Sequence, residues 1–348
     1  MKAAVFDGPE KLSIQQIPDP VAGPNDVVVD VVDCGICGSD LHSYLEGAFI
    51  APGQVMGHEF SGKIVELGKD VQGVKIGDRV TAVPLSTCGR CPRCLEGATH
   101  LCEIGLAESV AYGLPGAFAE FVRIPNVVLG GNLYKIPDNV DDAAGALVEP
   151  LAVALHAAKM SAPGPSDTCV VLGLGSIGLN TVQMLKALGA GRVIGIDISP
   201  VRLKLAAQLG ADITINGREV DALEAVTEIT GPGAYGVGAR ADIVIEASGV
   251  GALLNQAVSM TRAGGKLRIA ALYEGDVMVP ANQIVQKEMS VSGTFAYRGE
   301  FAQVLSLLAS GRIQAAPVIT HTFALDDIEQ AFRTQLDKDV SIKVQVAP

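Results

Sequence analysis

Four cysteines stand close together in the segment C-G-R-C-P-R-C-L-E-G-A-T-H-L-C, at Cys88, Cys91, Cys94 and Cys102. Gaps of two residues let successive thiolates turn toward one centre, and Zn²⁺ binds four soft ligands in a tetrahedron. Four sulfurs close the coordination shell, so the pattern predicts a structural zinc rather than a catalytic one. The alternative is a redox or disulfide cluster, which fits poorly with a chain that shows no secretory leader, because cytosolic thiols are kept reduced.

A second set of ligand types is spread more widely. Cys37 lies in C-G-I-C-G-S-D-L-H, His58 lies in G-H-E, and Glu149 lies in V-E-P. One thiolate, one imidazole and one carboxylate leave a fourth position open on Zn²⁺, which is the arrangement of a catalytic zinc. Each residue also has an ordinary structural interpretation. Cys37 would then be a small buried hydrophobe, His58 a satisfied core histidine, and Glu149 a charge at a helix N-terminus.

A glycine-rich turn predicts a dinucleotide site. Residues 173–178 read G-L-G-S-I-G, follow a predicted strand at 168–172 and open a predicted helix at 176–188. An acid, Asp197, ends the next predicted strand at 192–197. This context makes the G-x-G-x-x-G pattern specific, because a strand, a tight turn and a helix N-terminus together bind a pyrophosphate. The alternative is a glycine turn in a doubly wound sheet that binds nothing.

Each position of this turn has its own expected role. Gly173 permits the tight turn, Gly175 lets the backbone approach the pyrophosphate, and Gly178 allows the helix to pack closely on the strand. The candidate pyrophosphate-binding residues are Gly173, Gly175, Ser176, Ile177 and Gly178.

The residues after the second strand predict the choice of cofactor. Asp197 would accept hydrogen bonds from the adenosine ribose hydroxyls, and its charge would repel a 2′-phosphate, so NAD is favoured over NADP. Arg202 would pack on the adenine, or would simply be a solvated charge in the first turn of a helix.

The length of the chain and the pattern of its predicted strands and helices place these motifs in two domains. A chain of 348 residues is longer than one hydrophobic core usually accommodates. Residues 1–150 are rich in short strands and Gly/Pro turns and predict a β domain, with the zinc lobe at about 85–105. Strands alternate with helices over 151–285, which predicts a parallel, doubly wound sheet. Residues 286–348 are too short to fold alone and are expected to return to the first domain. The predicted class is α/β.

Composition excludes several functions. The formal net charge is −12 without a basic stripe, which argues against nucleic-acid binding. No uncharged apolar run reaches ~18 residues, and the N-terminus lacks a signal core, so we expect no membrane span and a cytoplasmic location.

Taken together, the motifs resemble the zinc-dependent medium-chain dehydrogenase/reductase superfamily from end to end. They are C-G-I-C-G-S-D-x-H, G-H-E, G-D-R-V at 77–80, the cysteine lobe, V-E-P at 148–150 and the glycine turn. The resemblance implies a GroES-like β domain, a Rossmann domain, NAD and two zinc ions per chain. It further implies a homodimer or homotetramer, in which apolar segments near residues 266–280 would pair sheets across a dimer.

The resemblance also implies roles in catalysis. Cys37, His58 and Glu149 would bind the catalytic zinc, with Glu59 used by some members in place of the later glutamate. Asp40 would orient His58 through a hydrogen bond. Two further residues would handle the substrate: Ser39 would hydrogen-bond its hydroxyl, and His42 would pass the proton to solvent through the cofactor ribose. The remaining cysteines and histidines are expected to be structural.

The segment G-T-F-A-Y at 293–297 bears on the substrate. Sorbitol dehydrogenases usually carry an arginine where this chain has Ala296, and losing that five-donor group argues against a long polyol. The segment resembles the butanediol branch instead, although the loop at 43–57 is shorter than is common there. We therefore expect NAD-dependent oxidation of a secondary alcohol or vicinal diol, such as 2,3-butanediol, to the ketone, and the reverse reduction.

Three alternatives stay open. The first is a polyol or sugar dehydrogenase of the sorbitol type, and a more distant one is a threonine-type dehydrogenase. The third is a different class, since some relatives without zinc act as quinone reductases or as lens crystallins. Such chains lose the cysteine lobe and often the catalytic Cys/His pair, and this chain keeps both.

Overall fold

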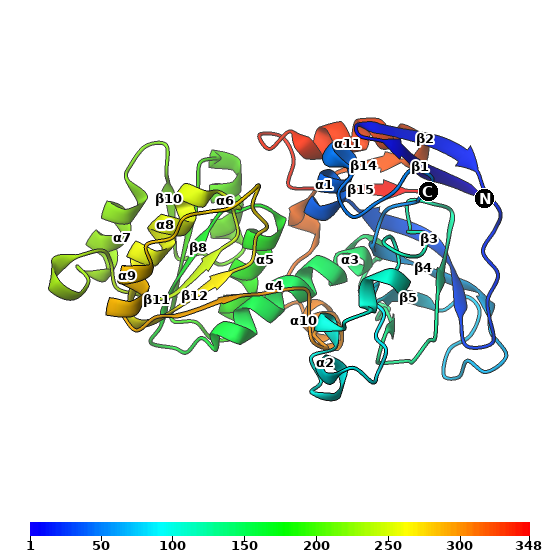
Figure 1. Cartoon of the computed structure of the whole chain (residues 1–348), viewed down its shortest axis with the longest axis horizontal. Coiled ribbons are helices and arrows are strands. Elements are labelled where there is room, and N and C mark those ends of the chain that lie inside the picture. Colours follow the sequence, from blue (N-terminus) through cyan, green and yellow to red (C-terminus); the bar gives the residue numbers. More distant parts are fainter. The chain divides into compact units, whose positions relative to one another are not determined.

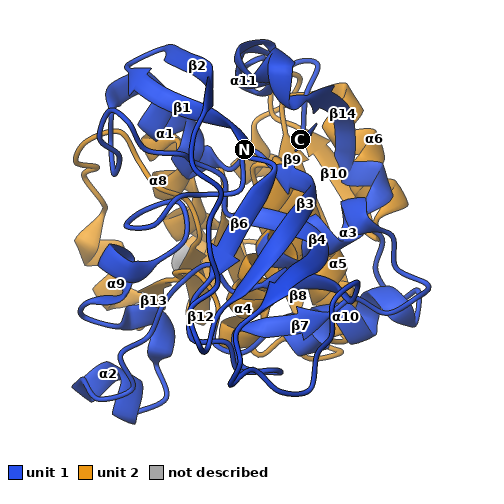
Figure 2. Ribbon diagram, turned by 90° about the vertical axis from the view of Figure 1, so that its right-hand side faces the viewer, with its two compact units in different colours: residues 1–149, 298–348 blue, residues 150–297 orange. Residues whose placement is uncertain are grey.

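The computed structural model describes residues 1–348, apart from the side chain of residue 235, as two compact units. Unit 1 combines residues 1–149 with 298–348, and unit 2 holds residues 150–297 (Figure 2). The sequence placed the start of the returning segment at 286. Residues 286–297 belong to unit 2 instead, because strand β13 (Ser290–Gly293) pairs with its sheet.

Unit 1 is built on a seven-stranded sheet in the order β14-β15-β3-β4-β5-β7, with β6 pairing to β3 (Figure 1). Its sheet strands are β3 (Val27–Gly35), β4 (Glu59–Leu67), β5 (Arg79–Ala82), β6 (Phe121–Ile124), β7 (Leu133–Lys135), β14 (Ile319–Ala324) and β15 (Lys343–Ala347). A separate hairpin and the helices complete the unit: β1 (Lys2–Gly8), β2 (Lys11–Gln16), α1 (Gly38–Glu46), α2 (Pro92–Leu95), α3 (Asp142–Ala146), α10 (Phe301–Ala309) and α11 (Ile328–Leu336). Helix α4 (Val148–Ser161) begins in unit 1 and continues into unit 2.

Unit 2 is a parallel sheet in the order β10-β9-β8-β11-β12-β13. Its elements are β8 (Thr168–Leu172), α5 (Ser176–Ala187), β9 (Arg192–Asp197), α6 (Pro200–Gln208), β10 (Ile213–Asn216), α7 (Ala222–Thr230), β11 (Ala241–Glu246), α8 (Gly251–Met260), β12 (Thr261–Ile269), α9 (Ala281–Gln286) and β13. Strand order reverses at β8, so right-handed crossovers place α5 and α8 on opposite sides of the sheet (Figure 1). Ligands of such sheets bind at this reversal, at the carboxyl ends of the strands.

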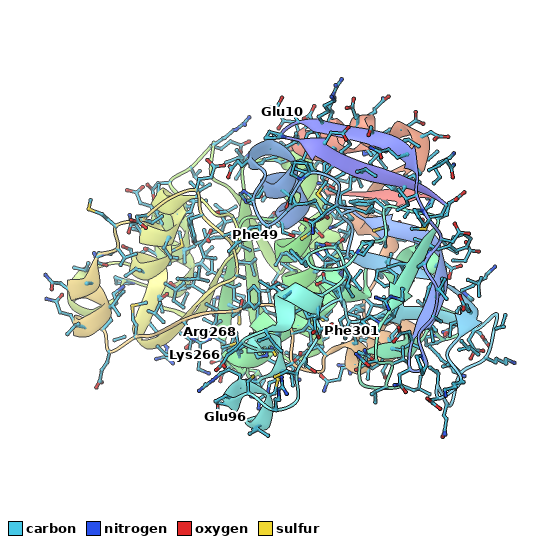
Figure 3. All side chains as sticks on the ribbon, turned by 45° about the vertical axis from the view of Figure 1, so that its right-hand side comes forward. Glu10, Phe49, Glu96, Lys266, Arg268 and Phe301 are labelled. Carbon is cyan, nitrogen blue, oxygen red and sulfur yellow. The ribbon has the colours of Figure 1, made fainter. Side chains whose placement is uncertain are left out.

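The central strand of this sheet shows why the sequence folds this way. In T-C-V-V-L at 168–172, every residue after the first is buried, as expected for a parallel strand covered on both faces. Cys169 lies here as a fully buried residue. On β12, the strand next to the edge of the sheet, Lys266 and Arg268 donate to the Ser161 and Met160 carbonyls (Figure 3). These cations satisfy the carboxyl end of α4, where the helix leaves carbonyls unpaired.

The C-terminal segment completes unit 1. Strand β15 pairs antiparallel with β3, and α11 packs on β15 and β14. Phe332 of α11 is fully buried, with its ring centroid 5.0 Å from that of Tyr44 and 5.7 Å from that of Phe118. Phe301, the first residue of α10, is also buried and packs against Tyr134 (Figure 3). The core of the first unit therefore contains the end of the chain. Within the described residues, every helix is too short or too polar to cross a lipid bilayer.

Phe332→Ala should lower the free energy of unfolding by about 3–5 kcal/mol, because it leaves a cavity between two aromatic rings. Val340→Ala is the matched control in the same segment, since Val340 is 55% exposed and its truncation should cost within about 0.5 kcal/mol. Denaturant unfolding of the two variants checks this. Equal stabilities would show that the C-terminal segment does not share the core of unit 1.

Candidate active site

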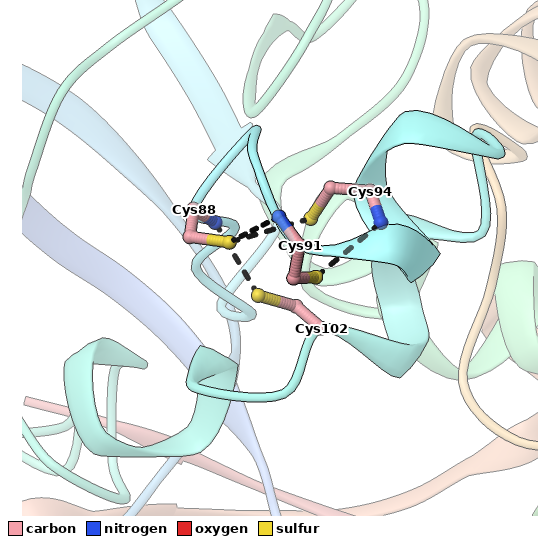
Figure 4. Close-up of side chains that lie close together, drawn as sticks. All are labelled: Cys88, Cys91, Cys94 and Cys102. Carbon is pink, nitrogen blue, oxygen red and sulfur yellow. Dashed lines mark hydrogen bonds between the residues drawn. The ribbon is translucent and has the colours of Figure 1, made fainter.

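The four lobe cysteines converge as the sequence predicted. Their sulfur atoms all lie within 4.8 Å of one another (Figure 4). Backbone amides turn toward them: Cys91 N–H donates to the Cys88 sulfur at 3.3 Å, and Cys94 N–H donates to the Cys91 sulfur at 3.4 Å. The Cys88 and Cys94 sulfurs are 3.9 Å apart, which is far longer than a disulfide bond. The cluster has the donor set and the convergence of a tetrahedral thiolate site.

Two of these four thiols have pKa values that are shifted in opposite directions. The N–H groups of Arg90 and Cys91 lower the pKa of Cys88 to about 6. Desolvation and the neighbouring Cys91 thiol raise the pKa of Cys94 to about 12. Such a spread is expected where like groups titrate together, because the first thiolate hinders the others. A divalent cation at the centre would favour all four thiolates.

A second cluster forms at the start of two elements of unit 1. Ligand atoms of Cys37, His58 and Glu59 lie within 4.8 Å of one another. Cys37 is the N-cap of α1, and Glu59 is the first residue of β4. Gly57, just before His58, has φ +94°, and a Cβ there would press on the Phe118 backbone. The turn that presents His58 therefore requires glycine.

Asp40 supports both sides of this cluster. Its carboxylate accepts the Cys37 N–H at 2.9 Å, and it lies 3.6 Å from Nδ1 of His58. This is the position from which a carboxylate orients a ligating imidazole. Burial acts to lower the pKa of His58, but Tyr112, Asp40 and Cys37 offset it and hold the pKa well above its ordinary value. The imidazole thus lies in surroundings that favour a cation.

Lys343 enters the cluster from the last strand of the chain. Its Nζ donates to both oxygens of Glu59, at 2.7 and 2.8 Å, and to the Ile36 carbonyl at 2.7 Å. Burial acts to lower the pKa of Lys343, but the charges of Glu59, Cys37 and Glu149 raise it above its ordinary value. The ammonium group therefore stays charged inside unit 1.

The two glutamates differ in position. Glu59 belongs to the compact group with Cys37 and His58, whereas Glu149 lies outside that group in the first turn of α4. Glu149 is buried, and its charge reaches Lys343. Of the two candidate carboxylate ligands, the structure brings Glu59 to the other donors.

The predicted proton-handling residues share helix α1. Ser39 is half-buried, and its Oγ lies 3.2 Å from the hydroxyl of Tyr112. His42, three residues further along, has a 29% exposed side chain, with Nδ1 4.0 Å from a carboxylate oxygen of Glu46. Residues three apart lie on one face of a helix, so the partly exposed imidazole shares a face of α1 with Ser39.

Sequence reasoning missed two residues of this site, Tyr112 and Lys343. The Tyr112 ring centroid lies 5.5 Å from that of His58. No motif marked either residue, because each approaches from a segment distant in sequence. The one available signal was for Lys343, a cation that alternates with apolar residues in the segment I-K-V-Q-V at 342–346.

The glycine turn of unit 2 also forms as predicted. Gly173 has φ +85°, and a Cβ there would press on Ser248, which follows β11. Gly175 is the N-cap of α5, so Ser176 and Ile177 occupy its first turn. A Cβ at Gly178 would overlap the Gly173 carbonyl oxygen. The backbone is thus open at the helix N-terminus, where anions bind.

Asp197 closes this turn. Its carboxylate accepts the Leu174 N–H at 2.7 Å and the N–H groups of Ile198 and Ser199 at 2.8 and 2.9 Å. A carboxylate has about four acceptor sites, so capacity remains for a hydroxyl ligand. Arg202 is half-buried on α6, which starts just beyond this loop.

Comparison with known proteins agrees with this geometry. The family model described as "Alcohol dehydrogenase GroES-like domain" matches residues 23–138, and "Zinc-binding dehydrogenase" matches residues 176–310. The chain is 36% identical to (R,R)-butanediol dehydrogenase of Bacillus subtilis over 100% of both chains. It is 34% identical to sorbitol dehydrogenase of the same species over 100% of this chain and 97% of that one. A putative zinc-binding dehydrogenase from Sinorhizobium meliloti, bound to NADP, matches with a TM-score of 0.90 at 32% identity, covering 100% and 99% of the two chains.

The chain therefore belongs to the zinc-dependent medium-chain alcohol dehydrogenases. It is an oxidoreductase of small-molecule alcohols that uses zinc and a nicotinamide cofactor. The predicted family, the α/β fold with GroES-like and Rossmann domains, and the enzyme class are confirmed.

Cys88→Ser should lower the zinc content by about one ion per chain and the free energy of unfolding by on the order of 3–5 kcal/mol, because metal binding at the lobe is coupled to folding. Elemental analysis of dialysed protein and denaturant unfolding measure the two effects. Cys169→Ser is the matched control, since that thiol is buried in β8 outside both clusters, and its zinc content should not change. Full zinc content in Cys88→Ser would contradict the structural assignment.

Proposed function

We propose that the protein is a zinc- and NAD-dependent dehydrogenase of secondary alcohols and vicinal diols such as 2,3-butanediol, and that it also reduces the matching ketones and diketones. The observation that carries this proposal is the thiolate–imidazole–carboxylate cluster of Cys37, His58 and Glu59, with the Ser39 hydroxyl on the adjoining helix. The choice of a short diol rests on Ala296, whose methyl group offers no donor to a long polyol.

The donor set of the cluster fits a catalytic zinc. Cys37 and His58 would hold the metal, and Glu59 is the carboxylate placed to join them, with Glu149 as the alternative. Zinc bound there would act as a Lewis acid and lower the pKa of the substrate hydroxyl. Lys343 partly neutralises Glu59, so the protein ligands carry less negative charge than a free thiolate and carboxylate. This charge balance would help a bound zinc ion to stabilise a developing alkoxide.

The proton path follows helix α1. Ser39 Oγ would hydrogen-bond the substrate hydroxyl, and His42, partly exposed on the same helix, would pass the proton to solvent through the ribose of the cofactor. Asp40 holds the helix start by bonding the Cys37 amide, so the hydroxyl and the metal ligands keep one geometry.

The turn at 173–178 would hold the cofactor, which accepts the hydride when bound. The open backbone at the start of α5 suits the pyrophosphate, and the remaining capacity of Asp197 suits the ribose hydroxyls. A carboxylate at this point disfavours a 2′-phosphate, which supports NAD over NADP.

A second candidate is a polyol dehydrogenase of the sorbitol type. The full-length similarity to sorbitol dehydrogenase of Bacillus subtilis favours it, at nearly the same identity as the butanediol enzyme. Other donors in the pocket would then have to replace the arginine absent at Ala296.

Initial rates with NAD should be highest for a short diol in a panel of 2,3-butanediol stereoisomers, 1,2-propanediol, 2-butanol, sorbitol, xylitol and L-threonine. We expect kcat/KM for 2,3-butanediol to exceed that for sorbitol at least about tenfold, since unpaired polyol hydroxyls would be buried at a cost. The proposal fails if sorbitol or xylitol is oxidised far faster than 2,3-butanediol.

Asp197→Ala should raise the KM for NAD roughly tenfold and relax the preference for NAD over NADP, because a hydrogen-bond acceptor and a repelling charge are both removed. Steady-state kinetics with each cofactor measure the ratio. Asp212→Ala, which removes a carboxylate bonded to Lys186 near the start of β10, is the control for general damage to unit 2. An unchanged cofactor preference in Asp197→Ala would refute the ribose role.

A further inference from the structure

The Tyr112 hydroxyl lies in the active site without a role in the reaction described above. The loop that carries it is tightly closed, since Ala111 N–H donates to the Leu114 carbonyl at 2.9 Å and Leu114 N–H donates to the Ser109 carbonyl at 3.0 Å. Ala111 has φ +71°, a conformation that side chains rarely adopt. The closed loop fixes the backbone from which the tyrosine projects.

Two further contacts hold Tyr112 in place, one through its carbonyl group and one through its ring. Gln54 Nε2 donates to the Tyr112 carbonyl at 3.0 Å, which joins this loop to the segment before His58. The Tyr112 ring packs at 42° on the imidazole of His58, with centroids 5.5 Å apart. The phenol oxygen therefore has a set position relative to the metal ligands, as a recognition group requires.

The phenol oxygen lies 3.2 Å from Ser39 Oγ, so two hydroxyl groups stand side by side at the metal cluster. A tyrosine hydroxyl has one donor and two acceptor sites, and the contact with Ser39 uses one of them. The two oxygens of a vicinal diol sit on adjacent carbons. They are therefore close enough together for each to hydrogen-bond to one of two adjacent hydroxyl groups. If Ser39 takes the reacting hydroxyl, the second hydroxyl of the same molecule falls within reach of Tyr112.

We propose that Tyr112 is a specificity-determining residue, whose hydroxyl binds the non-reacting oxygen beside the alcohol carbon that is oxidised. The inference rests on the proposed function and deepens it, since it assigns the diol preference to one group. A mono-alcohol has no oxygen there, and the Tyr112 hydroxyl then keeps its bond to Ser39. The bond to the second oxygen is made in the bound substrate and in the transition state alike, so its loss is expected chiefly in KM.

Tyr112→Phe tests this with one oxygen removed and the ring retained. With zinc-loaded enzyme and NAD, kcat/KM for 2,3-butanediol should fall roughly 5- to 50-fold, while that for 2-butanol should change less than about threefold. Tyr134→Phe is the matched control, because that hydroxyl donates to the Gly131 carbonyl in the same unit, away from the cluster. Its diol-to-mono-alcohol ratio should equal that of the wild type, and thermal unfolding reports whether both variants fold.

The outcomes separate the possible roles. An unchanged ratio in Tyr112→Phe overturns the inference, and so does an equal fall for both substrates, which would show that Tyr112 acts on the proton transfer through Ser39. A wild-type enzyme that oxidises neither 2,3-butanediol nor 2-butanol overturns the proposed function, and with it the inference. A fall confined to the diol supports both.

Discussion

A buried ammonium group beside a buried carboxylate joins the end of this chain to its reactive centre. The Lys343 and Glu59 side chains are 4% and 1% exposed, with nitrogen and oxygen 2.7 Å apart. Either charge alone would be expensive to bury, so each requires the other. Because Lys343 begins β15 and Glu59 begins β4, the pair can form only when the C-terminal segment has docked on unit 1. The Lys343–Glu59 pair is therefore present only when unit 1 is completely folded.

The pair also sets the charge balance of the site. Cys37 and Glu59 would supply negative charge for a metal, while Lys343 brings one positive charge to the same group of side chains. The charge of Glu149 helps to raise the pKa of Lys343, while the ammonium group donates to Glu59 and to the Ile36 carbonyl. The sequence alone left the two glutamates as alternatives, because the family resemblance implies that either one can be the ligand.

The sequence could predict those parts of the site that depend on residues close together in the chain. The cysteine lobe and the glycine turn depend on residues within one short segment, so spacing alone indicated their geometry, and the structure shows both. Cys37 and His58 also came together as expected, since each lies in a motif with its own turn. Tyr112 and Lys343 could not be found in this way, because their roles arise from contacts across the fold.

The boundary at 286 was wrong for a related reason. Strand β13 is short and mostly exposed, so S-V-S-G carries no apolar pattern, and only its pairing with β12 identifies it as part of the parallel sheet. The sequence pattern likewise did not predict the closed loop at 109–114. Its shape depends on a positive φ at Ala111, a residue whose identity gives no hint of that conformation.

The two ends of the cysteine lobe meet at a neck. Ser86 N–H donates to the Ser109 hydroxyl at 2.9 Å, and Val110 N–H donates to the Pro84 carbonyl at 3.0 Å. A segment whose ends are already bonded can be lengthened, shortened or exchanged without moving the chain on either side. The lobe is thus closed at its base, and Arg298 also holds its far side by donating to the Gly97 and Glu96 carbonyls at 2.6 and 2.8 Å. Tyr112 lies just beyond the neck, so the bonds that close the lobe also anchor the loop that carries its ring.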